Sequence, residues 1–299
     1  MVTGRDGQLA RSLAERGGQA ELVFVGRPDF DLMDPVSIER TIERVRPDVI
    51  VNAAAYTAVD AAEDDADTAM AVNGVAPGVI ADAATKVGAR LIQISTDYVF
   101  DGTLDRPYRE DDPTSPLGVY GRTKLAGELA VTASQADAAI LRTAWVYGPF
   151  GNNFVKTMLR LADSRDGVAV VSDQHGSPTS SIDLAEAVLR LIAVWQREGS
   201  GPGTTIYHVA GSGATTWSGL ARAVFDVRRE LTGKAPVVRE IATSDYPTKA
   251  RRPGNSIMDC TKLATALHWT LPDWRDSVTV VTEQLLGDQR ATTLVGSQT

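Results

Sequence analysis

Short apolar runs alternate with longer amphipathic stretches over the first two-thirds of the chain. Apolar runs of about four to eight residues predict buried strands, and apolar positions three or four apart predict helices. Strands are therefore expected at residues 22–26, 48–52, 90–95 and 139–146. Helices are expected from Asp34 and Pro35, an N-cap followed by a proline at the first helical position, and at roughly 60–87 and 119–134. This alternation predicts an α/β fold of the Rossmann type, a doubly wound parallel sheet with helices on both faces.

The pattern becomes less regular after about residue 150. Strands are expected near 168–172, 205–210 and 237–241, among helices near 153–164, 182–197, 217–231 and 274–286. This mixture predicts a smaller α/β region that interleaves with the sheet. We expect a dinucleotide-binding domain over residues 1–150, to which later segments can return, and a mainly substrate-binding domain over residues 151–299.

Composition narrows the function classes. The 299-residue chain is 43% hydrophobic and 23% charged, as is ordinary for a globular protein, and its net charge is −8. An acidic chain is a poor candidate for non-specific binding of nucleic acid or anionic membranes. Cys260 is the only cysteine, which excludes an intrachain disulfide, and we find neither a membrane-spanning run nor a signal-peptide pattern. We therefore expect a cytoplasmic protein with no nucleic-acid or membrane partner.

A glycine-rich turn stands at the head of the series. Gly4 and Gly7 occupy the first two positions of a Gly-x-x-Gly-x-x-Ala pattern, which lets a pyrophosphate approach the amides of the following helix. A dinucleotide is therefore expected here, although such a turn alone is often only a loop. Only residues 1–3 precede it, where a strand of about five residues is usual. We expect either a short strand or a longer natural start, in which case added upstream residues should raise the melting temperature.

Arg27 follows the second predicted strand and bears on cofactor choice. An acid at this strand end commonly binds the ribose hydroxyls of NAD, whereas a cation suits the 2′-phosphate of NADP. The arginine favours NADP; the alternative is an ordinary surface side chain.

Tyr120 and Lys124 form a Tyr-x-x-x-Lys pair inside a predicted helix. Four residues are about one helical turn, so both side chains can lie on one face. A lysine cation should stabilise the phenolate and lower the tyrosine pKa from about 10. Thr96 closes a predicted strand, where its hydroxyl could hold a substrate oxygen beside Tyr120; it could also satisfy a local backbone group. The pair alone is weak evidence for a catalytic role, because tyrosine and lysine at this spacing are common on solvated helices.

Longer sequence segments point to a specific protein family. Residues 3–9, 46–63, 95–102, 116–128, 142–148, 151–158, 173–179 and 251–256 resemble the extended short-chain dehydrogenase/reductases, and within them the dTDP-4-dehydrorhamnose reductases. The resemblance covers residues 1 to about 285. The Ser-Thr-Asp-Tyr-Val-Phe, Asp-Gln-x-Gly-x-Pro-Thr and Arg-Pro-x-Asn-Ser segments are its specific parts, whereas the glycine turn and the Tyr-x-x-x-Lys pair indicate only the superfamily.

The resemblance implies an activity. It predicts an oxidoreductase of dTDP-rhamnose biosynthesis that uses NADPH, with NADH as an alternative donor, to reduce the C4 keto group of dTDP-4-dehydro-L-rhamnose. Thr96, Tyr120 and Lys124 would be the catalytic triad: Tyr120 protonates the C4 oxygen, Thr96 hydrogen-bonds it, and Lys124 tunes Tyr120 and binds the nicotinamide ribose.

The resemblance also implies two sets of binding residues. The cofactor set is Gly4, Asp6, Gly7, Gln8, Leu9, Arg27, Asp31, Leu32, Ala53, Ala54, Ala55, Tyr56, Asn73, Tyr120 and Lys124. The substrate set, for a dTDP-4-keto-6-deoxy-L-sugar, is Thr96, Asp97, Tyr98, Trp145, Asn153, Phe154, Lys156, Gln174, Pro178, Thr179 and Arg252. The alternatives are a helix-surface amide for Asn73, plain core packing for Trp145 and an exposed loop position for Arg252.

One feature departs from the family pattern. Some members dimerise through magnesium bridged by a glutamate in the first helix, where this chain has Ser12. We therefore expect no metal, and a monomer or weak homodimer. The acidic run from Asp60 to Asp67 is expected to be a solvated helix start favoured by the helix dipole.

Three other functions remain open at this stage. The chain could reduce a related dTDP-keto-sugar of the streptose type. It could be a sugar-nucleotide epimerase or dehydratase that keeps its NAD, or a non-catalytic NADP-binding regulatory subunit.

Overall fold

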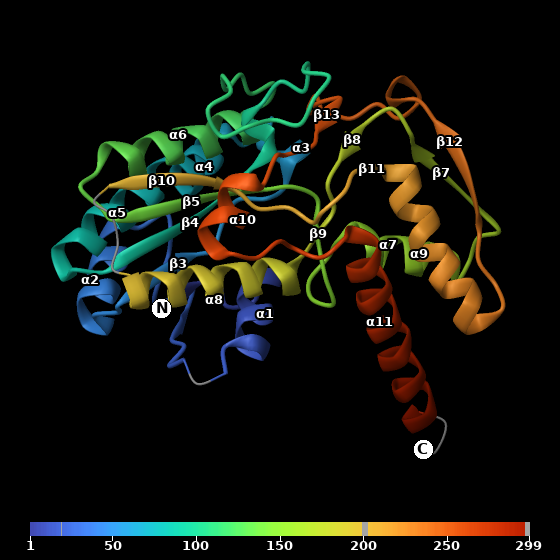
Figure 1. Ribbon diagram of the computed structural model, residues 1–299, viewed down its shortest axis with the longest axis horizontal. Helices are drawn as coiled ribbons and strands as arrows, with labels where there is room; N and C mark the ends of the chain where they lie inside the picture. The colour runs from blue at the N-terminus through green and yellow to red at the C-terminus, as the bar shows by residue number, and fades with distance from the viewer. Residues whose placement is uncertain (19, 199–202, 297–299) are drawn as a thin grey trace.

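A six-stranded sheet forms the centre of the computed structural model, which describes residues 1–18, 20–198 and 203–296 (Figure 1). Its strand order is β10-β5-β4-β3-β1-β2, and every pairing in it is parallel. The strands are β1 (Val2–Thr3), β2 (Phe24–Val25), β3 (Val49–Asn52), β4 (Arg90–Thr96), β5 (Ala138–Thr143) and β10 (Thr204–His208). The predicted Rossmann-type α/β fold is confirmed, with a first strand of only two residues.

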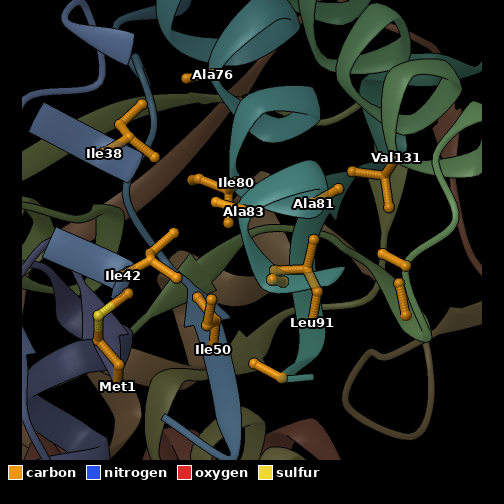
Figure 2. Close-up of a cluster of buried hydrophobic side chains, with 14 of the residues drawn as sticks. Met1, Ile38, Ile42, Ile50, Ala76, Ile80, Ala81, Ala83, Leu91 and Val131 are labelled. Carbon is orange, nitrogen blue, oxygen red and sulfur yellow. The ribbon is translucent and has the colours of Figure 1, made fainter. Parts of the chain in front are cut away.

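Helices cover both faces of this sheet. One face carries α2 (Pro35–Val45), α5 (Ala76–Val87) and α6 (Val119–Ala133), and the other carries α1 (Gln8–Arg16), α8 (Ser181–Glu198) and α10 (Thr261–Leu267). Figure 2 shows the first core, in which Ile38 and Ile42 of α2 face Ile80 of α5 and Ile50 of β3. These side chains are fully buried, because the i, i+4 spacing on α2 turns one apolar stripe toward the sheet.

The helix expected at about 60–87 consists of four successive helical segments. They are α3 (Val59–Ala62), α4 (Ala66–Met70), the π-helical segment η1 (Ala71–Val75) and α5. Within η1, the Asn73 side chain binds both the backbone N–H and the C=O of Tyr56, at 2.9 and 3.0 Å. Pro77 then stands in the first turn of α5, where a missing N–H is tolerated. The predicted helical stretch is therefore largely confirmed: residues 66–87 are continuously helical through α4, η1 and α5, and the interruption lies at residues 63–65, between α3 and α4.

The strand expected at 139–146 also divides. β5 ends at Thr143, and Trp145 has a φ of +49°, in the left-handed region that large side chains rarely adopt. The chain then enters β6 (Val146–Tyr147), which pairs with β9 (Thr179–Ser180) outside the main sheet. This bend carries the chain from the dinucleotide-binding sheet into the C-terminal region.

The C-terminal region has its own core. It packs α7 (Phe154–Ala162), α9 (Trp217–Thr232) and α11 (Trp274–Gly296) against the parallel pair β7 (Gly167–Val171) and β12 (Val237–Ile241). The remaining short elements are β8 (His175–Gly176), β11 (Thr215–Thr216), β13 (Asn255–Ser256) and the 3-10 turns η2 (Asp97–Val99) and η3 (Thr243–Asp245). The two-residue strands β8, β9, β11 and β13 were not expected, because strands this short leave no alternation to detect; the short helix α10 was not expected either.

Three late elements return to the dinucleotide-binding part: β10 is an edge strand of the central sheet, and α8 and α10 pack against the sheet. The domain division at residue 150 stays a prediction. Over the described ranges, no helix combines the length and the apolar character that a membrane span requires.

Candidate active site

The strands of a parallel sheet present their carboxyl ends at one edge, where ligands bind. A cavity of about 1130 Å³ opens at this edge, lined by the turns that follow β1, β2, β3 and β4 and by residues of α6. Pockets for a single drug-sized ligand measure roughly 300–1,000 Å³. The volume is therefore large enough for more than one small molecule.

The three predicted catalytic side chains meet in the wall of this cavity. Thr96 is the last residue of β4 and is only 5% exposed. Tyr120 and Lys124 lie one turn apart in the first half of α6. The Thr96 hydroxyl accepts from the backbone N–H of Tyr98 at 3.2 Å and donates to Asp97 Oδ1 at 2.9 Å. The hydroxyl thus satisfies the local backbone and also lies on the cavity wall, so the two readings of Thr96 are compatible.

Burial controls the acidity of Tyr120. It raises the pKa of the phenol to about 12, with the negative charge of Asp97 adding to the effect and the Thr96 hydroxyl opposing it. The expectation that Lys124 lowers this pKa was wrong for the free protein, because desolvation dominates and the ammonium instead donates to the Ile94 carbonyl at 2.6 Å. The phenol is therefore protonated at neutral pH, the state that a proton donor requires.

Lys124 is itself nearly inaccessible, at 4% exposure. Burial lowers the pKa of its ammonium to about 8, and the Glu128 carboxylate one turn further along α6 opposes that fall. Glu128 is held in turn by Arg142 of β5, through Nη2 at 2.6 Å and Nε at 3.0 Å, and by the Ser95 hydroxyl. A buried ion pair between α6 and β5 therefore supports the charge of Lys124.

Asp97 is a deeply buried acid in the cavity wall. It is 2% exposed, and burial raises the pKa of its carboxyl to about 6, against the opposing effect of the Ser256 and Thr96 hydroxyls. Its Oδ2 atom has no hydrogen-bond partner among the described residues. A buried polar atom without a partner is costly, so this oxygen is a candidate acceptor for a ligand hydroxyl.

The glycine-rich turn suits a dinucleotide pyrophosphate. Gly4 has a φ of +74°, and a Cβ there would lie 3.0 Å from Ala54 on the neighbouring β3 turn. The N-cap of α1 is Gly7, which offers no side-chain cap to the first amides of the helix. Those amides and the positive end of the helix dipole face the cavity mouth and fit an anion.

Two arginines converge beside this turn. Arg27 follows β2, and the Arg5 guanidinium donates to the Arg27 carbonyl at 2.8 Å. Both line the cavity with Asp31 and Leu32. Two cations at one rim suit the dianionic 2′-phosphate that distinguishes NADP from NAD. Arg5 was not predicted, because a variable position inside a glycine turn carries no signal of its own.

Every other predicted cofactor residue lines the cavity except Asn73. Asn73 is buried behind Tyr56, whose backbone it holds, and its amide nitrogen also donates to the Thr123 hydroxyl at 3.3 Å. The structure gives it a supporting position between the β3 turn and α6. Contact with a cofactor stays a prediction for this residue.

The predicted substrate residues divide into two groups. Thr96, Asp97, Tyr98 and Trp145 line the cavity, whereas Asn153, Phe154, Lys156, Gln174, Pro178, Thr179 and Arg252 lie outside its lining. Trp145 stacks on Trp217 with ring centroids 3.6 Å apart and planes 9° from parallel. Trp217 also packs on Phe154 and donates to Gln174 Oε1 at 3.1 Å. Some of the outlying residues are thus connected to the cavity through Trp217, which the sequence did not single out.

Asn153 and Lys156 hold the start of α7. The Asn153 side chain accepts from the Lys156 backbone N–H at 3.1 Å as an N-cap, and its amide nitrogen donates to Gln8 Oε1 at 2.9 Å. The Lys156 ammonium donates to the Pro149 carbonyl at 3.1 Å. The helix start is therefore bonded directly to the glycine-rich turn that carries Gln8.

Arg252 is bound to a carboxylate in this structure. Its guanidinium donates to both oxygens of Asp60, at 2.7 and 3.1 Å, and this pairing raises its pKa. Ser12, the position at which a magnesium-bridging acid was considered, lies buried with its hydroxyl 2.9 Å from that of Ser181. Over the described ranges, no group of three or more His, Cys, Asp or Glu side chains is arranged to hold a metal ion.

Comparison with known proteins gives the family. Residues 1–286 match the family described as "RmlD substrate binding domain". The chain belongs to this RmlD family. A relative from Sinorhizobium fredii, named dTDP-4-dehydrorhamnose reductase, is 45% identical over 277 residues, covering 92% of this chain and 94% of its own.

Solved structures agree with the RmlD assignment. A dTDP-4-dehydrorhamnose reductase from Clostridium acetobutylicum superposes with a TM-score of 0.88 at 35% identity, covering 95% of this chain and 98% of its own. A second, from Bacillus anthracis in complex with NADP, gives a TM-score of 0.87 at 32% identity with the same coverage. The resemblance stated from the sequence is confirmed over nearly the whole chain.

Several cavity residues of this RmlD-family chain were missed. They are Arg5, Gly26, Phe30, Met33, Thr57, Val59, Thr68, Val72, Ile94, Ser95, Thr143, Val146, Gly151, Asn152 and Leu184. Phe30 and Met33 flank the predicted Asp31 and Leu32, so proximity could have suggested them. Leu184 on α8 had no local signal, because only the return of α8 to the sheet brings it to the site.

Proposed function

We propose that the protein is the NADPH-dependent reductase that converts dTDP-4-dehydro-L-rhamnose to dTDP-L-rhamnose. The observation that carries the proposal is the meeting of Thr96, Tyr120 and Lys124 in the same cavity as the glycine-rich turn. A cofactor anchored at that turn and a carbonyl held at Thr96 would share one enclosed space. The names of the relatives, dTDP-4-dehydrorhamnose reductase, support the choice of sugar.

Each side chain has a task in this reaction. The nicotinamide supplies the hydride when it is bound. Tyr120, kept protonated by burial, donates its phenolic proton to the C4 oxygen of the sugar. Thr96 would turn its hydroxyl proton from Asp97 Oδ1 to that oxygen, and Asp97 Oδ2 would accept from a neighbouring sugar hydroxyl. Lys124 would hold the cofactor ribose. Its positive charge would also offset the negative charge that remains on Tyr120 after the phenolic proton is donated.

NADPH is the proposed donor, with NADH as an alternative. Arg5 and Arg27 at the cavity rim supply positive charge for the extra phosphate. The Bacillus anthracis relative binds NADP, which agrees with this assignment.

The alternatives differ in what they consume. An epimerase or dehydratase would regenerate its NAD, whereas this reductase consumes one NADPH for each sugar reduced. A regulatory subunit would bind NADP without turnover, and the assembled Thr96, Tyr120 and Lys124 argue against that reading. Reduction of a streptose-type keto-sugar would use the same chemistry, so only the identity of the product distinguishes that function from the proposed one.

The deciding experiment mixes the purified chain with dTDP-4-dehydro-L-rhamnose and NADPH. Loss of the reduced-nicotinamide absorbance follows the reaction, and mass spectrometry with NMR identifies the sugar. Stoichiometric oxidation with dTDP-L-rhamnose formed supports the proposal. NADPH binding without oxidation would reject this substrate and favour another keto-sugar, or a binding role if a panel of keto-sugars also fails.

The proposal includes a monomer or weak homodimer acting in the cytoplasm. A single cysteine, Cys260, and the acidic net charge are consistent with that compartment. Sedimentation analysis at several protein concentrations tests the assembly, and cell fractionation tests the location.

A further inference from the structure

The catalytic helix α6 begins without a cap of its own. Its N-cap residue is Gly118, which makes no side-chain hydrogen bond to the first turn. The first amides of a helix have no intrahelical partner, and an uncapped end tends to fray. Tyr120 is the second residue of this helix, so fraying would displace the proposed proton donor directly.

Glu63 supplies the missing cap from another part of the chain. Its Oε1 accepts from the Val119 backbone N–H at 2.7 Å, across 56 residues of sequence. A Cβ at position 118 would lie 2.6 Å from that oxygen, so the glycine allows the carboxylate to approach. A negative charge at this place also complements the positive end of the helix dipole.

The segment around Glu63 is anchored on the opposite side. Asp60 accepts from the Ala250 backbone N–H at 3.0 Å and pairs with Arg252, and Asp64 pairs with Lys249. Three carboxylates of the acidic run therefore have tertiary partners. Asp65 and Asp67 are exposed, as expected of a solvated helix start, whereas Asp60 and Glu63 differ from that expectation because they contact the C-terminal region and α6.

A second link joins the same segment to α6. Asn73 binds the backbone of Tyr56 and donates to the Thr123 hydroxyl, which itself donates to the Tyr120 carbonyl at 2.9 Å. The segment thus bonds α6 directly at Val119, through Glu63, and indirectly at Thr123, through Asn73. Two such contacts fix the position and direction of the first helical turn.

We propose that Glu63 is a positioning residue for the reduction, a tertiary N-cap of α6 that holds Tyr120 in line with Thr96. This inference rests on the proposed function for its kinetic consequences, although the cap itself does not depend on it. Misplacing a catalytic group by about 1 Å can lower a rate on the order of a hundredfold, so the contact has a measurable effect on turnover.

The test compares four variants. Glu63→Ala removes the cap, and Glu63→Gln keeps an acceptor oxygen without the charge. Gly118→Ala keeps Glu63 but displaces its carboxylate, and the backbone at φ −127° accepts alanine without strain. Asp273→Ala is the matched control, because Asp273 accepts from the Arg275 N–H at 2.9 Å at the start of α11 and is not among the residues that line the cavity.

Two readouts decide the proposal. Hydrogen–deuterium exchange at the first turn of α6 should speed up in Glu63→Ala and Gly118→Ala and stay near wild type in Glu63→Gln and Asp273→Ala. With keto-sugar and NADPH, kcat should fall roughly ten- to a hundredfold in the first two variants, with little change in NADPH affinity. Glu63→Gln should recover most of that loss.

If hydrogen–deuterium exchange at the first turn of α6 is unchanged in Glu63→Ala, the proposal that Glu63 caps this helix is wrong. Faster exchange with kcat within about twofold of wild type overturns the positioning role, because a misplaced group should slow the reaction far more. A wild-type chain that binds NADPH but turns over no keto-sugar refutes the proposed function instead, and the exchange measurement still decides whether Glu63 caps α6.

Discussion

The ion pair between Glu128 and Arg142 gives the sharpest test of the site's architecture. Both side chains are 3% exposed, and the guanidinium reaches the carboxylate through Nη2 at 2.6 Å and Nε at 3.0 Å. Glu128→Gln keeps the shape of the side chain and removes its charge. The variant leaves an arginine cation buried without a carboxylate.

The expected loss is large. Removing one partner of a buried pair costs about 3–5 kcal/mol, because the remaining charge stays desolvated without compensation. For a chain of this size that corresponds to a fall in Tm on the order of 10 °C. Urea unfolding followed by circular dichroism measures the free energy of unfolding, and calorimetry measures Tm.

The control is an exposed pair of similar geometry. Asp226 and Arg229 on α9 are 2.7 Å apart, with side chains 63% and 53% exposed. Asp226→Asn should change the free energy of unfolding by less than about 0.5 kcal/mol, because water screens the charges. The double variant Glu128→Leu with Arg142→Met should recover much of the stability by replacing both charges with apolar groups.

The same substitution has a functional signature. Glu128 opposes the fall in the Lys124 pKa, so its neutral analogue should move that pKa further below about 8. The limb of the pH–rate profile that reports Lys124 should therefore shift toward acid. The reasoning is refuted if the free energy of unfolding of Glu128→Gln lies within about 1 kcal/mol of the wild-type value, because a buried cation without a partner should destabilise the fold by more than that.

Three further predictions concern the cavity. Tyr120→Phe should lower kcat by roughly 10²–10⁴, because the proton donor is lost; a variant within tenfold of wild type would contradict the role. Burial raises the pKa of Asp97 from 3.8 to about 6. Between these two pH values the carboxyl is protonated in the folded chain and ionised in the unfolded chain. The free energy of unfolding should therefore fall as the pH rises from about 4 to about 6. Asp97→Asn should remove that fall and raise Tm at neutral pH while weakening sugar binding, as calorimetry and KM would report. Arg27→Ala should weaken NADPH binding far more than NADH binding in a fluorescence titration; equal losses would reject its place at the 2′-phosphate.

The sequence alone carried the fold class and the core of the site. Apolar runs between amphipathic stretches specify buried parallel strands, because both faces of such a strand must be covered. Parallel strands in turn bring their carboxyl ends to one edge. This geometry placed Gly4 and Thr96 at one edge although they lie far apart in the chain, whereas the grouping of Thr96 with Tyr120 and Lys124 came from the family resemblance.

Only the tertiary structure decided how those groups behave. The pKa of Tyr120 depends on the sum of burial and neighbouring charge, and that sum reverses the direction expected from Lys124 alone. Glu63 reaches the start of α6 only because the segment after β3 passes beside it. Trp217 reaches Trp145 only because the chain bends after β5. Local patterns encode hydrogen-bond ladders and buried faces within a few residues, whereas desolvation and long-range contacts exist only after the chain has folded.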